Sequence, residues 1–230
     1  PVSQLKVSDV SEEAYNINVE GHGLTGPLQG FGQLWQKTYQ VRLTGAGTSP
    51  AEVVKYWKAN LPNLMPANSR FYPSVAGVEP GEVLVINASL PGIPGGMPVS
   101  TGVMILYADD VMFSVMTPDG HPESGFNTFS AFEEDGVTIA QIQSLARAND
   151  PIFEIGFRFL GGSSQQEQIW RHVLNGLAAH FEIAAEVTME KVCVDSRLQW
   201  NYAKNVRHNS VIRTTLSLPK RWADRALGRT

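Results

Sequence analysis

The chain has 230 residues, of which 43% are hydrophobic and 17% charged, the composition of a globular protein with an ordinary core. Its single cysteine, Cys193, excludes an intramolecular disulfide. The opening residues PVSQLKVSDVSE lack the basic start and apolar run of a secretory signal, so we expect a cytoplasmic protein. No charged residue occurs from 83 to 108, but prolines and glycines interrupt this stretch, and no membrane insertion is expected.

Charge is distributed unevenly along the chain. The net charge is -4, but residues 191–230 carry nine Lys or Arg against Asp195 and Asp224, which is +7, so residues 1–190 carry -11. The positive charges are spaced rather than clustered in the short runs that bind phosphates, so no nucleic-acid partner is expected. We expect the basic segment to cover acidic surface of its own chain or of a second copy. A contact with nucleic acid or an anionic membrane is the less favoured alternative.

The first regular pattern is a weak alternation of apolar residues at 15–19, which predicts a short strand in a polar lead-in. A clearer period of two follows at residues 34–43 and is typical of a half-buried strand. Ser49 suits a helix N-cap and Pro50 the first helical position. A helix is therefore predicted from there to about Asn60, ended by the prolines that follow.

Six short β runs come next, each bounded by turn residues. Asp135 and Gly136, between the last two runs, form a strong hairpin signal. Connections this short produce an antiparallel meander, because parallel strands need crossovers of a dozen residues or more. With the strand at 34–43, the runs predict a seven-stranded curved sheet. They cover residues 70–78, 82–90, 101–108, 111–117, 125–132 and 137–145.

The last strong pattern is helical, at residues 163–183, with an apolar stripe that must be buried. A meander followed by one long amphipathic helix predicts an α+β fold in which the sheet curves around that helix. We expect this domain to span residues 34–183, between an N-terminal extension of residues 1–33 and a basic C-terminal extension of residues 184–230. In the latter, residues 187–194 are expected to pair as a strand or pack on the body. The stripe consists of Ile169, Trp170, Val173, Leu174, Leu177 and Phe181.

Two motifs that point to cofactor or metal chemistry lack the context they need. Gly21, Gly23 and Gly26 match G-x-G-x-x-G, but no strand-to-helix turn surrounds them, so we interpret them as a loop and not a dinucleotide site. The five histidines show no H-E-x-x-H spacing, and one cysteine excludes the multi-cysteine zinc patterns. We therefore expect neither cofactor nor metal.

The loop richest in chemistry is TPDGHPESGF, residues 117–126, which carries His121 and Glu123 between two strands. A histidine beside a carboxylate can act as a general acid–base pair, with the carboxylate fixing the tautomer of the ring. The alternative is a hairpin loop shaped by its prolines and glycines, without a catalytic role. The sequence leaves both interpretations open.

Several strings together resemble the START and polyketide cyclase-like superfamily (SRPBCC, helix-grip), more narrowly a bacterial branch of unknown function. They are GQLWQKTYQVRL, SPAEVVKYWKANLP, PGEVLVINASLPG, STGVMILYADD and TPDGHPESG, with the closing helix. The resemblance covers about residues 31–183. It implies a helix-grip fold with a cavity between sheet and last helix, used across the superfamily to bind lipids, sterols, polyketides or other apolar molecules. Some relatives are cyclases, aromatases or dehydratases, but they share no universal catalytic residues, so no active site is carried over.

The leading hypothesis is binding of a small apolar or amphipathic molecule, lipid-like, polyketide or aromatic, in an internal cavity. One alternative is a cyclase- or dehydratase-type enzyme acting in the same cavity through His121 and Glu123, and another is a protein-interaction module, with homo-oligomers formed through the C-terminal extension. Gln141 and Gln143 share one strand face with apolar residues, so a polar group is expected to point inward. Residues 92–97 are the expected gate. The residues expected to line the cavity are Trp57, Tyr72, Met104, Phe113, Met116, Phe126, Phe129, Gln141, Gln143 and Trp170.

Overall fold

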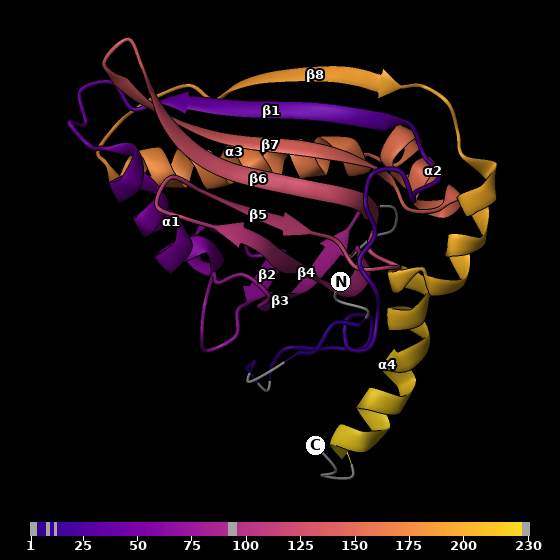
Figure 1. Cartoon of the computed structure of the whole chain (residues 1–230). Coiled ribbons are helices and arrows are strands. Elements are labelled where there is room, and N and C mark those ends of the chain that lie inside the picture. The colour runs from indigo at the N-terminus through magenta and orange to yellow at the C-terminus, as the bar shows by residue number, and fades with distance from the viewer. Residues whose placement is uncertain (1–3, 8–9, 12, 92–95, 227–230) are drawn as a thin grey trace.

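The computed structural model has an eight-stranded antiparallel sheet that curves around one long helix (Figure 1). It describes residues 4–7, 10–11, 13–91 and 96–226. The order across the sheet is β2-β3-β4-β5-β6-β7-β1-β8, so the meander runs in sequence and the first strand closes against its last strand. The α+β helix-grip class is therefore confirmed. The strands are β1 (Leu34–Arg42), β2 (Ser69–Tyr72), β3 (Val83–Leu90), β4 (Met97–Ala108), β5 (Met112–Met116), β6 (Glu123–Glu134), β7 (Val137–Ala148) and β8 (Thr188–Asp195).

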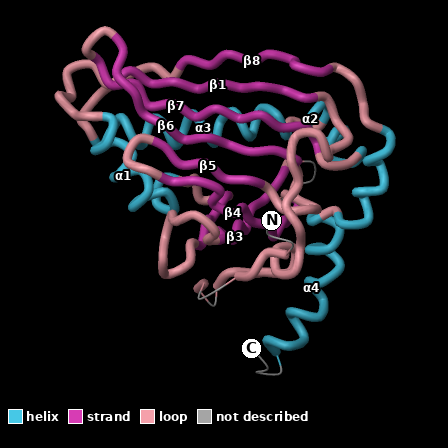
Figure 2. The backbone as a smooth tube through the Cα atoms, in the orientation of Figure 1, coloured by secondary structure: helices cyan, strands magenta, loops and turns pink. Residues whose placement is uncertain are grey.

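Helices α1 and α3 lie along one face of the sheet (Figure 2). α1 begins with a capping box, in which the Ser49 side chain accepts from the amide of Glu52 at 3.3 Å and the Glu52 carboxylate accepts from the amide of Ser49 at 2.8 Å. α3 is the predicted long helix, whereas α2 was not expected from the sequence. Asp150 caps α2, and Gly161, at a φ of +82°, separates it from α3. The helical segments are α1 (Pro50–Leu64), α2 (Pro151–Phe159), α3 (Gly162–His180), η1 (Trp200–His208) and α4 (Ser210–Ala226).

The inner face of the sheet packs against α1 and α3. α3 buries Trp170, Val173, Leu174 and Leu177, four residues of the predicted stripe. α1 contributes Trp57, whose ring meets strand aromatics edge to face. Burial of this apolar surface is the main stabilisation of the domain.

The outer face of the sheet is covered as well. Leu5 and Val19, from the N-terminal extension, pack on Val83 and Met104 of the sheet. The segment at residues 15–19 is irregular, so the strand expected there is wrong. It is held instead by a side chain, because the amide of Asn18 donates to the carbonyl of Ser100 at 2.7 Å and to Thr214 Oγ1 of α4 at 3.1 Å.

The C-terminal segment forms the eighth strand and then crosses one end of the sheet. β8 pairs antiparallel with β1, as expected for residues 187–194, and η1 and α4 continue past β4 (Figure 1). The buried guanidinium of Arg147 donates to the carbonyl of Gly32 at 3.1 Å and contacts Asp195 at 3.4 Å. The basic segment thus contacts its own chain. No helix of the described residues is long and apolar enough to cross a bilayer.

A chain that ends at Ile183 should melt at a lower temperature than the full chain. This chain loses the hydrogen bonds between β8 and β1, the Asp195 partner of Arg147 and the packing of α4 on β4. Together these contribute several kcal/mol, so we expect the melting temperature to fall by on the order of 10 °C or more. Calorimetry of the two proteins at one concentration and pH checks this. Equal melting temperatures would show that the segment is only peripheral.

Candidate functional site

An apolar cavity of about 120 Å³ lies between the inner face of the sheet and α3. Strands β2 to β6 supply one wall, α3 and the end of α1 supply the other, and Phe157 of α2 also lines it. A single water needs only about 10–15 Å³ of such space, so the cavity has room for a ring-sized group. Its apolar residues include Leu84, Ile86, Val103, Val115, Phe129 and Ile169.

Residues that line the cavity also carry polar atoms that have no partner within the described part of the chain. These are Thr101 Oγ1, Asn127 Oδ1, Gln165 Oε1 and Trp170 Nε1, all buried. Gln165 Nε2 donates to the carbonyl of Ser89 at 2.8 Å, which fixes the orientation of its amide. An unpaired buried polar group costs about 1–3 kcal/mol, so this wall is under-satisfied.

Glu123 lies where the cavity meets a polar cleft of about 380 Å³. As the first residue of β6, it shares the inner-facing parity of Asn127 and Phe129. Gln166 Nε2 donates to Glu123 Oε2 at 2.5 Å. Among the described residues no hydrogen bond reaches Oε1. Burial raises the pKa of Glu123, opposed by the positive charge of Lys37 and by the Gln166 bond.

Lys37 lies beside Glu123, but its hydrogen bonds go elsewhere. It is buried on the inner face of β1, and its ammonium group donates to Gln166 Oε1 at 2.6 Å and to Ser163 Oγ at 3.2 Å. Its nitrogen also lies 3.6 Å from Glu167 Oε1. Burial lowers the pKa of Lys37, opposed by Glu123 and, more weakly, by Glu167. The Gln166 amide thus connects the ammonium group to the carboxyl group.

His121 lines the same cavity without bonding the carboxyl group of Glu123. Its Nδ1 lies 3.0 Å from both the backbone N and the backbone O of Glu123. Burial lowers the pKa of His121 to about 4, so the ring is neutral at neutral pH. The histidine–carboxylate pair suggested by the sequence is not formed, because the carboxyl group turns to Gln166 instead.

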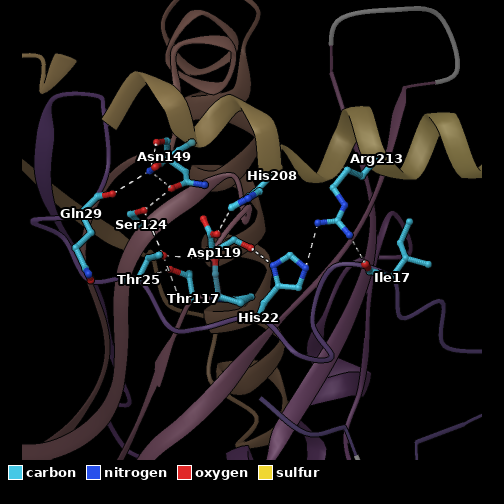
Figure 3. Close-up of polar contacts among 12 residues, drawn as sticks. Ile17, His22, Thr25, Gln29, Thr117, Asp119, Ser124, Asn149, His208 and Arg213 are labelled. Carbon is cyan, nitrogen blue, oxygen red and sulfur yellow. Dashed lines mark hydrogen bonds and ion pairs between the residues drawn. The ribbon is translucent and has the colours of Figure 1, made fainter. Parts of the chain in front are cut away.

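The connection that carries His121 and Glu123 is anchored from outside the cavity (Figure 3). The His208 ring pairs with the carboxylate of Asp119, and His22 Nδ1 lies 3.1 Å from the carbonyl of Asp119. Further along, Ser124 Oγ donates to Asn149 Oδ1 at 2.7 Å. Both chain extensions therefore help to fix the loop that presents the two titratable groups to the cavity.

Four of the predicted cavity residues form one aromatic cluster. Phe129 and Trp170 line the cavity, with ring centroids 5.6 Å apart. Trp57 and Phe113 lie behind Phe129, the first edge to face at 5.4 Å and the second stacked on it at 4.6 Å. These two support the wall without being among the residues that line the cavity.

The other six predicted cavity residues lie on the outer face of the sheet, so those predictions are wrong. Met116 is the register partner of Met104 and of Phe126, and Met104 packs with Leu5 and Val19 of the N-terminal extension. Because both faces are covered, apolar side chains occur at both parities, and apolar character alone does not identify the inner face. The six are Tyr72, Met104, Met116, Phe126, Gln141 and Gln143.

The two glutamines illustrate this correction. Gln141 accepts from Gln40 Nε2 at 2.7 Å, and Gln143 Nε2 donates to Thr38 Oγ1 at 3.4 Å, both on the outer face. Their amides are satisfied there and do not reach the cavity. Residues 92–95 of the expected gate lie outside the described residues.

Sequence reasoning missed Lys37 and Gln166, although each carried a signal. Lys37 falls on the apolar face of its strand, between Trp35 and Tyr39, which is an unusual place for a charge. Gln166 precedes Trp170 by four residues and so extends the apolar stripe of α3. A polar residue on a buried face indicates a partner or a function.

Comparison with known proteins concerns the fold. No family model matches the sequence, and no curated protein does. Similar solved structures include the KanY protein (TM-score 0.48, 12% identity, 66% of this chain and 99% of that chain). The di-domain ARO/CYC StfQ from the steffimycin biosynthetic pathway is similar at a TM-score of 0.47 and 10% identity over 65% of this chain and 50% of that chain. Major latex-like protein 151 from Panax ginseng is similar at a TM-score of 0.44 and 15% identity, over 65% of this chain and 99% of that chain. The sheet order and the long helix of this structure agree with the helix-grip fold that the resemblance implies.

Stability should fall with acidification because His121 is a partly buried, neutral ring in the folded protein. Its pKa is about 4 in the folded protein and about 6.5 when unfolded, so the unfolded state binds the proton first. The loss begins near pH 6.5 and is complete below about pH 4, where it reaches about 3 kcal/mol. Urea unfolding at pH 7, 5 and 4 should show a weaker pH dependence in His121→Gln. Equal dependence in both proteins would contradict the assignment.

Proposed function

We propose that the chain binds a small molecule with an apolar body and polar substituents in the cavity between the sheet and α3. The apolar walls suit a ring system or a segment of an acyl chain, and the polar cleft beside Glu123 suits a hydrophilic end. Lipid-like, polyketide and aromatic molecules all combine these two features.

The observation that carries the proposal is the set of unpartnered polar atoms in an otherwise apolar cavity. The amide oxygens of Asn127 and Gln165 accept hydrogen bonds, and the indole N–H of Trp170 donates one. A molecule with both a donor and an acceptor, such as a phenol or a hydroxylated ring, satisfies groups that the protein leaves unpaired. Purely hydrophobic ligands would leave that cost in place.

Binding is tested by isothermal titration calorimetry with 2-naphthol, which has a bicyclic body and one hydroxyl group. The wild type should bind it saturably, with one molecule per chain. Val103→Phe should abolish binding because the ring enters the cavity. Trp170→Phe should weaken it about five-fold, the value of one hydrogen bond of about 1 kcal/mol.

The matched control is Trp200→Phe, which changes an indole that is 71% exposed and packs on Phe31 outside the cavity. Its affinity for 2-naphthol should equal that of the wild type. Absence of saturable binding to the folded wild-type protein would refute the proposal.

The unpartnered hydroxyl of Thr101 gives a second test that needs no ligand. Thr101→Val has nearly the same shape and removes the buried hydroxyl, so the unliganded protein should become more stable by about 1 kcal/mol. Urea unfolding measures the change. A destabilised variant would show that the hydroxyl is already satisfied in the unliganded state.

A further inference from the structure

The two oxygens of the Glu123 carboxyl group have different surroundings. Oε2 accepts from Gln166, whereas Oε1 has no hydrogen-bond partner among the described residues, and the residue lines an apolar cavity. Glu123 is only partly buried and lines the polar cleft as well as the cavity, so Oε1 is accessible from both. One oxygen here is left for another molecule.

Neighbouring charges do not neutralise this group directly. The hydrogen bonds of the Lys37 ammonium group go to Gln166 and Ser163, and its ion pair is with Glu167. The hydrogen bond from Lys37 orients the Gln166 side-chain amide, so that its oxygen faces Lys37 and its nitrogen faces Glu123. The carboxyl group is therefore held in position while Oε1 stays free to react.

A second requirement is a donor for developing negative charge. Trp170 lines the same cavity, and its indole N–H is buried without a partner in the part of the chain that the structure describes. A carboxylate oxygen without a hydrogen bond and an unpaired donor, on two residues that line one cavity, are the parts needed to remove a proton from a carbon beside a carbonyl group.

We infer that Glu123 is the general base of a proton transfer at the carbon next to the carbonyl group of a bound ketone, with Lys37 and Gln166 as positioning residues. The inference rests on the proposed function, because the ketone occupies the same cavity. Glu123 Oε1 takes the proton, the C–H electron pair becomes the C=C bond of an enolate, and the charge on the carbonyl oxygen is stabilised by the Trp170 N–H. The Glu123 proton exchanges with solvent through the polar cleft that this residue also lines, and return of a proton or deuteron from Glu123 to the carbon restores the ketone, so the step needs no oxidant or reductant.

The test uses acetophenone in D₂O, with the loss of its methyl signal followed by proton NMR. Wild-type protein should exchange these hydrogens faster than buffer. Glu123→Gln should slow the excess rate at least about 100-fold, the usual contribution of a general base, while binding acetophenone within a few-fold of wild type. Glu133→Gln, on an exposed part of the same strand, should exchange like the wild type.

The pH profile of the wild type provides a readout that does not depend on folding of a variant. The excess rate should rise with pH through the pKa of Glu123, which burial raises above that of an ordinary carboxyl group. Other titratable groups interact with Glu123 or Lys37: Tyr39 on β1, Glu167 on α3, Lys191 on β8 and the neutral His121. The Gln166→Leu variant lacks the hydrogen bond from the Gln166 side chain to Glu123. The midpoint of its pH–rate profile should move to higher pH, because that hydrogen bond favours the carboxylate.

The outcomes separate the two proposals. Acetophenone that does not bind, or that binds without exchange above buffer, overturns the catalytic inference, as does a Glu123→Gln protein that exchanges at the wild-type rate. If 2-naphthol binds in those cases, the cavity remains a binding site. If neither compound binds, the proposed function fails as well.

Discussion

The width of the sheet is the constraint on which the rest of the structure depends. Eight strands at about 4.8 Å spacing span about 34 Å, whereas a helix with its side chains is about 10–12 Å across. Curvature lets α1 and α3 cover much of the inner face, but two helices do not fill it everywhere. The apolar residues of β3, β4 and β5 beyond the Phe129–Trp170 contact therefore border empty space. The cavity follows from the fold itself.

The way charge is buried beside this cavity gives it chemical character. In a direct Lys37–Glu123 ion pair, the ammonium group would donate to the carboxylate oxygens, and these would no longer be free for a ligand. Here an amide separates them, and Glu167 takes the place of Glu123 as the ionic partner of Lys37. The opposite charge is near enough to favour the ionised form of Glu123 without occupying its second oxygen. Burial opposes that ionisation, and the balance raises the pKa.

Local patterns predicted the strands, the meander and the long helix because each depends on spacing along the chain. The assignment of side chains to the cavity failed where it depended on the other face. Met104 and Met116 are as apolar as Phe113 and Phe129, since Leu5 and Val19 cover the outer face. α2 was missed because a nine-residue segment between a strand and a helix gives little periodicity. The two hydrogen bonds of the Gln166 side chain join Lys37 to Glu123, and only the folded topology brings these three residues together.

The chain extensions influence the site through the connection between β5 and β6. Gly120 has a φ of +86°, and a Cβ there would lie 2.1 Å from the carbonyl oxygen of His208, so the tail and the loop are in close backbone contact. The amide of Ser210 donates to the carbonyl of Gly120 at 3.0 Å. His121 and Glu123 follow within three residues, so a displacement of the C-terminal segment at 208–210 would move the backbone from which both side chains enter the cavity. General-base catalysis tolerates little displacement of the base. The tail, although remote from the cavity, is therefore part of what positions its carboxyl group.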